Sequence, residues 1–227
     1  ARIRAFVGSA VQGLEPAPDV HALHSAFVVG LSGVWRLPLP NLHKEVLWRL
    51  SVNGVSGAGG HDVVPSRPCP CGWRPSPVER AWPTAQGAPA ARAHVFCHCP
   101  VARAVFDAVA ACLPPALHLR RHHVWLCIPP SGDINQSVWR VVCLAALSAM
   151  WKGHRLLWTL EQPDVLLRAS RRAVADFWSR LDECVFALNA SGARWFGAEA
   201  LPAGHPFVDS APGFPGRCFV RFPADPG

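Results

Sequence analysis

Two short cysteine and histidine clusters in this sequence have the composition of a metal site. Cys69 and Cys71 form a Cys-x-Cys pair, and the segment HVFCHC, residues 94–99, offers two more cysteines and two histidines. Thiolate sulfur and imidazole nitrogen are the ligands of tetrahedral Zn²⁺ sites, which hold the ion with four protein side chains. The two clusters therefore predict one Zn²⁺ bound by a Cys₃His or a Cys₄ set.

The segment between the two clusters indicates why a metal would be needed. It spans 25 residues rich in Pro, Ala and Arg and contains no obvious core segment. Hydrophobic contacts alone would close such a loop poorly, whereas a bound Zn²⁺ contributes its binding free energy directly to folding. The alternative is that these cysteines are ordinary small apolar residues, or remnants of a site that no longer binds.

The charge balance favours an anionic partner. The chain has 227 residues and a formal net charge of +7, carried almost wholly by arginine. Arg92 and Arg103 flank the metal cluster, and Arg120 and Arg121 lie in a basic run, so we expect these four to contact nucleic-acid phosphates. The alternative is that arginine is common for reasons of codon usage and that the surface is only mildly basic.

The cysteine count and the hydropathy pattern bear on location. Nine cysteines, an odd number mostly scattered on apolar faces, favour an intracellular, reducing compartment, nuclear or cytoplasmic. No apolar run reaches the roughly 20 residues of a membrane span, so we expect no membrane partner.

Hydrophobic periodicity predicts a mainly α-helical fold. We expect helices over residues 20–31, capped by Asp19, and from an Asn41 cap to about residue 52, with Lys44 facing out. A further helix should begin at Pro100 with Cys99 as its cap. Residues 122–128 look like a strand or an extended connector.

A pair of long helices should follow this zinc-knuckle-like segment. The first runs from about residue 135 to 160 and is apolar on nearly all sides; the second runs from about 164 to 189. We expect four regions: an irregular lead-in (1–34), a zinc-binding segment with flanking helices (35–113), a helical segment (114–190) and a Pro/Gly-rich tail (191–227). His122, His123 and His154 are predicted to be surface or interfacial residues.

Four segments together resemble a known family: LHKEVLWRLSVNGV, CPC, HVFCHCPVARAVFDAV and VWRVVCLAALSAMWKGHRLLW. Their order is similar to the zinc-binding region C-terminal to the reverse transcriptase of plant and algal non-LTR retrotransposons. The resemblance implies Cys69, Cys71, His94 and Cys99 as zinc ligands, with Cys97 as the alternate. It departs from the family in having Cys-x-Cys where Cys-x-x-Cys is usual.

The resemblance implies a zinc- and nucleic-acid-binding accessory region, with a polymerase domain upstream as its partner. The parent protein would be an RNA-directed DNA polymerase, but this segment has no Asp-Asp pair for a two-metal site and no G-x-S-x-G motif, so we expect it to be non-catalytic. Two alternatives stay open. One is a helical protein-interaction module anchored by Trp139, Val142 and Trp151, with a purely structural zinc; the other is a decayed retroelement fragment.

Overall fold

The computed structural model describes residues 2–52, 69–74, 87–111, 113, 117–131, 134, 136–158 and 164–190. The described part of the chain is mainly helical and contains no strand, which confirms the predicted fold class. The predicted Pro/Gly-rich tail (191–227) and the stop signal at Asn53 and Gly54 lie outside the described residues.

The described residues of the N-terminal third include α1 (Arg2–Val11), α2 (Val20–Arg36) and α3 (Asn41–Ser51). α1 was not expected. The Asp19 carboxylate caps α2 as predicted, accepting hydrogen bonds from the backbone N–H groups of His21 and Ala22. The N-cap of α3 is Pro40, so the prediction of Asn41 was one residue late.

Lys44 of α3 is buried, which corrects the prediction that it faces solvent. Its ammonium donates hydrogen bonds to the carbonyl oxygens of Trp35, at 3.1 Å, and Leu37, at 2.7 Å. These carbonyls belong to the C-terminal end of α2, where the helix leaves acceptors without intrahelical partners and where its dipole favours a cation. Lys44 therefore fixes the turn between α2 and α3.

The middle of the chain supplies α5 (Gly87–Ala93), the π-helical turn η1 (His94–His98), α6 (Pro100–Ala110) and α7 (Arg121–Trp125). Cys99 is the N-cap of α6, as predicted. The short segment read as a strand or connector is instead the helical turn α7, because Val124 and Trp125 turn together into the core. Periodicity cannot distinguish a helix from a strand in so short an apolar run.

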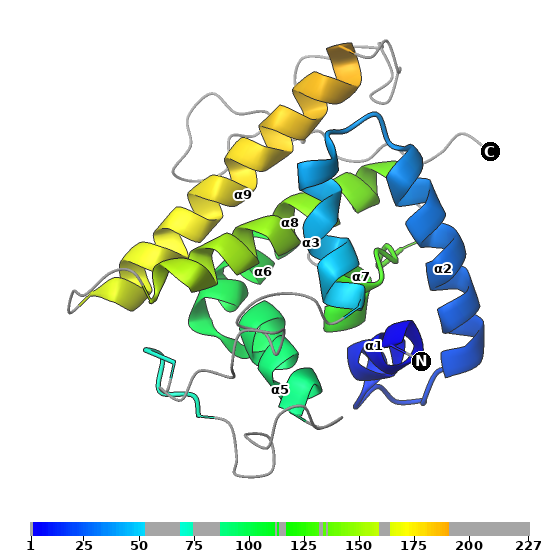
Figure 1. Cartoon of the computed structure of the whole chain (residues 1–227), viewed down its shortest axis with the longest axis horizontal. Helices are drawn as coiled ribbons and strands as arrows, with labels where there is room; N and C mark the ends of the chain where they lie inside the picture. The colour runs from blue at the N-terminus through cyan, green and yellow to red at the C-terminus, as the bar shows by residue number, and fades with distance from the viewer. Residues whose placement is uncertain are drawn as a thin grey trace.

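The two long helices are α8 (Gln136–Leu156) and α9 (Val165–Ala190), and they run side by side across the molecule (Figure 1). α6 packs against both, and α3 packs on α8. Trp139 is fully buried and Val142 nearly so, which means that these two residues form core and cannot anchor a partner. No helix in the described ranges has the length and hydropathy to cross a bilayer.

Candidate metal centre

Four buried side chains converge at the junction of the middle segment with α8. The ligand atoms of Cys69, His94, Cys99 and His154 all lie within 4.8 Å of one another, and no one of the four residues is more than 4 % exposed. Buried polar groups need partners, and thiol and imidazole groups grouped in this way are the donors of a tetrahedral metal site. The cluster can hold a metal ion.

A tight turn places Cys69. The backbone N–H of Gly72 donates to the carbonyl of Cys69 at 2.7 Å, and the N–H of Cys69 donates to the carbonyl of Trp73 at 2.9 Å. Gly72 has φ +91°, a conformation that side-chain-bearing residues rarely adopt. The turn carries both Cys69 and Cys71 to one side, even though only one residue separates them.

A π-helical turn brings His94 and Cys99 together. Five residues along an ordinary α-helix rotate a side chain by about 500°, which would leave these two about 140° apart around the axis. Here the N–H of Cys99 bonds the carbonyl of His94 at 2.8 Å, an i to i+5 bond that widens the turn. Cys99 then leaves the helix with extended backbone and caps α6.

The last turn of α8 contributes His154. Its neighbour Gly153 is packed so closely that an added Cβ would lie 2.6 Å from the Ala173 Cβ and 2.8 Å from Val101 Cγ1. α8 can therefore approach α6 and α9 only because residue 153 has no side chain. That approach is what carries His154 to Cys99, at the N-terminus of α6.

One separation within the cluster matches the spacing of ligand atoms around a tetrahedral ion. With metal–sulfur bonds of about 2.3 Å and metal–nitrogen bonds of about 2.0–2.1 Å, neighbouring ligand atoms should be roughly 3.3–3.8 Å apart. Cys69 Sγ lies 3.8 Å from His154 Nε2. Cys71 Sγ lies 3.6 Å from His94 Nε2 and is partly exposed, at the edge of the cluster. The site thus offers four buried donors and a fifth beside them.

Burial shifts the pKa values of His154 and Cys69 in opposite directions. Burial, with the nearby charge of His94, lowers the pKa of His154 to about 4, so its imidazole is neutral and ready to coordinate at neutral pH. Hydrogen bonding with Cys99 and burial raise the pKa of the Cys69 thiol to about 12. A metal ion that binds there must displace the thiol proton, which a divalent cation does by stabilising the thiolate.

The ring of His94 is held on both sides. Trp73 stacks on it, with ring centroids 4.3 Å apart and planes 7° from parallel, and His154 meets it edge-on at 5.7 Å. A ligating imidazole needs its orientation fixed by neighbours, and aromatic packing does so here. The turn that carries Cys69 therefore also positions His94.

Three of the four residues expected as ligands, Cys69, His94 and Cys99, meet in the buried cluster, whereas Cys71 lies at its edge. The alternate, Cys97, points away and lines a separate cavity beside the end of α1. His154 was expected at a surface or interface, and that prediction was wrong, because it is buried in the cluster. The signal that could have found it was a histidine near the end of an otherwise apolar helix, which must have a partner.

Two of the four arginines expected to contact phosphates have structural roles. Arg92 is 3 % exposed, and its guanidinium donates to the carbonyl of Leu50 at 3.3 Å and lies over the Phe6 ring. Arg121 donates to the carbonyls of Ala10 and Gln12 at the end of α1. The prediction for Arg92 is therefore corrected: a buried guanidinium has no surface to offer a nucleic acid.

The other two arginines of this set, Arg103 and Arg120, are exposed. Comparison with known proteins adds nothing to this geometry. No family model, curated protein or solved structure matches the chain.

Proposed function

We propose that this chain is a non-catalytic helical module, closed by one structural Zn²⁺, that acts as a nucleic-acid-binding accessory region of a retrotransposon reverse transcriptase. The observation that carries the proposal is the buried cluster of Cys69, His94, Cys99 and His154. It joins the middle of the chain to α8, so that a bound ion would tie together segments separated by 85 positions in sequence.

Zinc is the ion that this donor set fits best. Two thiolates and two imidazoles in a tetrahedral arrangement suit Zn²⁺, while Mg²⁺ and Ca²⁺ require oxygen ligands. A catalytic zinc keeps one position for water or substrate, whereas here four buried protein donors would fill the coordination sphere. The role of the ion is therefore structural: it would hold the 69–74 turn and η1 against α8.

The nucleic-acid part of the proposal has separate support. The net charge of +7 and the order of the Cys/His and helical segments favour it. Arg103 and Arg120 are the exposed members of the predicted contact set. Contacts of this kind neutralise phosphates without reading bases, and each releases counterions.

Metal analysis of the purified full chain tests the zinc site. We expect about one Zn²⁺ per chain, lost when Cys69→Ser and Cys99→Ser are combined. His154→Ala should lower the zinc affinity by at least about tenfold, since even indirect damage to a ligand set costs 10- to 100-fold. Cys97→Ser is the matched control, because Cys97 is a half-buried thiol outside the cluster.

Cys71→Ser identifies the fourth ligand. If Cys71→Ser loses the ion and His154→Ala keeps it, the site is the Cys₃His set implied by the resemblance and the Cys₂His₂ assignment fails. Absorption of the Co²⁺-substituted protein counts the thiolates independently. A zinc content near zero in the folded protein would refute the metal proposal altogether.

Salt titration of nucleic-acid binding tests the other half of the proposal. Affinity for RNA or DNA should fall steeply with salt, and Arg120→Ala should weaken binding about equally on unrelated sequences and lower the salt slope by roughly one unit. A folded, zinc-loaded protein with no measurable affinity at low salt would exclude the accessory role.

A second candidate function, a protein-interaction module, has its own observation. α2 and α3 expose several large apolar side chains: Val28, Val29, Trp35, Leu42 and Trp48. Trp35 and Trp48 meet edge-on with ring centroids 6.4 Å apart, so their exposed parts form one patch. Exposed aromatic groups of this kind anchor protein interfaces. In this alternative the zinc site keeps its structural role.

A further inference from the structure

Another cavity lies outside the metal cluster, between α3, α8 and α9. It has a volume of about 410 Å³, within the range of small-ligand pockets. Its walls are apolar: Leu42 and Val46 from α3, and Trp151 and Leu156 from α8. None of the four residues of the Cys/His cluster lines this cavity.

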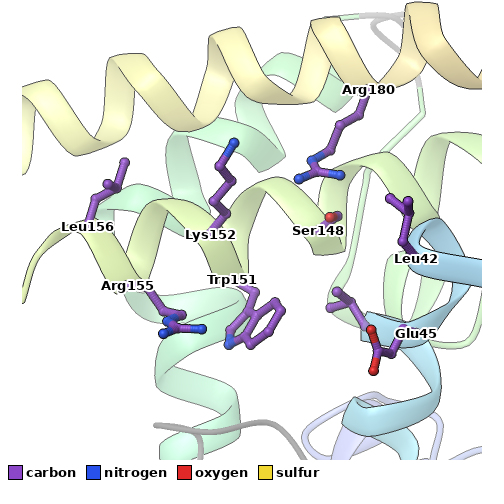
Figure 2. Close-up of a pocket in the computed structure, with 9 residues that line it drawn as sticks. Leu42, Glu45, Ser148, Trp151, Lys152, Arg155, Leu156 and Arg180 are labelled. Atoms are coloured by element: carbon purple, nitrogen blue, oxygen red, sulfur yellow. The ribbon is translucent and has the colours of Figure 1, made fainter.

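Three cationic side chains also line the cavity: Lys152, Arg155 and Arg180. Figure 2 shows Lys152 pointing from α8 toward α9 and Arg180 pointing from α9 toward α8, while Arg155 lies beside Trp151 on the other side of α8. The Arg155 guanidinium lies 5.5 Å from the centroid of the Trp151 ring. The cavity is therefore apolar at its walls and positively charged on both sides.

Nearby acids neutralise this charge only in part. Asp176 approaches Lys152 at 3.3 Å, but it also approaches Arg172 at the same distance, so two cations share one carboxylate. The carboxylate of Glu45, at the rim, is paired with Arg49. Among the residues that the structure describes, the three cations outnumber these two acids, and an excess of positive charge favours an anionic ligand.

Arg180 supplies the most specific indication that the cavity binds an anion. Its Nε is buried, yet has no hydrogen-bond partner among the residues that the structure describes. A buried donor without an acceptor is costly, and a bound phosphate or carboxylate oxygen would satisfy it. Ser148, whose hydroxyl lines the same cavity, lies close to the Arg180 guanidinium in Figure 2.

We propose that this cavity binds a nucleotide unit of a single-stranded nucleic acid, with the base against the apolar walls and Trp151 and the flanking phosphates against Arg155 and Arg180. This inference rests on the proposed nucleic-acid function and names the site that grips the strand. Single-strand sites combine an aromatic platform with a cationic groove. Cations on two sides of an apolar floor match a strand, in which each base is flanked by two phosphates; an acidic peptide carries no such regular alternation.

Fluorescence anisotropy with the full zinc-loaded chain tests the site. The probes are a labelled 12-nucleotide single strand of RNA or DNA, the corresponding duplex, and an acidic peptide containing Leu and Phe. Arg180→Gln and Trp151→Leu should each weaken single-strand binding about fivefold or more. Arg171→Gln is the matched control, because Arg171 is an exposed arginine of α9 outside the cavity.

The single strand should bind more tightly than the duplex, because the cavity takes an unpaired base, and equal affinities would overturn the inference. If Arg171→Gln weakens single-strand binding as much as Arg180→Gln, and Trp151→Leu leaves the affinity unchanged, the strand binds to the basic surface in general and not to the cavity. The cavity inference then fails, and the proposed function stands. If no nucleic acid binds at low salt, the proposed function fails as well. Peptide binding that depends on Arg180 and Trp151 would assign the cavity to a protein ligand and overturn the inference. Trp151→Phe, which keeps an aromatic ring, should retain most of the affinity and guards against a folding defect in Trp151→Leu.

Discussion

Replacing Gly153 by alanine tests whether the close packing of three helices holds the metal centre together. The new Cβ would lie 2.6 Å from the Ala173 Cβ and 2.8 Å from Val101 Cγ1, both well below ordinary contact distance. Overpacking of this kind costs typically about 1–3 kcal/mol. Alanine in a helix gains about 1 kcal/mol over glycine, so we expect a net loss of up to about 2 kcal/mol.

Gly30→Ala is the matched control. Gly30 lies inside α2, and an added Cβ there would meet nothing within 4 Å. The helix propensity gain of about 1 kcal/mol should then appear undiminished, and the variant should be more stable than the parent. The two substitutions are chemically identical, so the difference between them isolates the packing cost.

Urea unfolding at saturating zinc measures both variants, and zinc competition measures the metal site. Because Gly153 precedes His154, a displaced α8 should also weaken zinc binding in Gly153→Ala, while Gly30→Ala should leave it unchanged. The reasoning is refuted if Gly153→Ala is as stable as Gly30→Ala and binds zinc equally well. Helix α8 would then not depend on close approach to deliver His154.

Two further predictions concern groups outside the metal centre. Lys44→Met should destabilise the protein by about 1–3 kcal/mol, because it leaves the carbonyls of Trp35 and Leu37 without their donor. The control, Arg49→Met, removes an exposed ion pair of α3 and should change the unfolding free energy by less than about 1 kcal/mol. Equal effects of the two substitutions would contradict the buried role of Lys44. Burial, with the charges of His122 and Arg120, lowers the pKa of His123 to about 4. As the pH falls, His123 is therefore protonated in the unfolded chain before it is protonated in the folded protein. The free energy of unfolding should fall as the pH drops from about 6.5 to about 4. His123→Asn should flatten this part of a urea-midpoint profile recorded at equal metal content, and an unchanged slope would show that His123 does not titrate with unfolding.

Local patterns predicted most of the helices, because their signals lie within a few residues of one another. The Asp19 cap, the Cys99 cap before Pro100 and the two long apolar helices were all visible in this way. The metal centre was predictable only in part. Cys69, His94 and Cys99 lie in the two clusters, but His154 lies 55 or more positions away on another helix, and its approach depends on a tertiary contact at Gly153.

Charged residues misled the sequence argument for a physical reason. Arg92 and Lys44 look like surface cations, and both are buried because each finds backbone carbonyls to bind. Long side chains of this type can bury their stems and satisfy their heads inside the protein. Sequence alone does not show which carbonyls a fold leaves without partners.

The π-helical turn between His94 and Cys99 constrains the number of residues in this segment, in addition to the identity of its buried residues Val95 and Phe96. Side chains at positions 95–98 can vary as long as packing allows, since the ring closes through the backbone of residues 94 and 99. Removing one of these positions would return the turn to α-helical register and swing the cysteine by about 100° around the axis. Single-residue deletions and insertions here should thus be more damaging than most substitutions, and this segment would be a poor place to splice or graft.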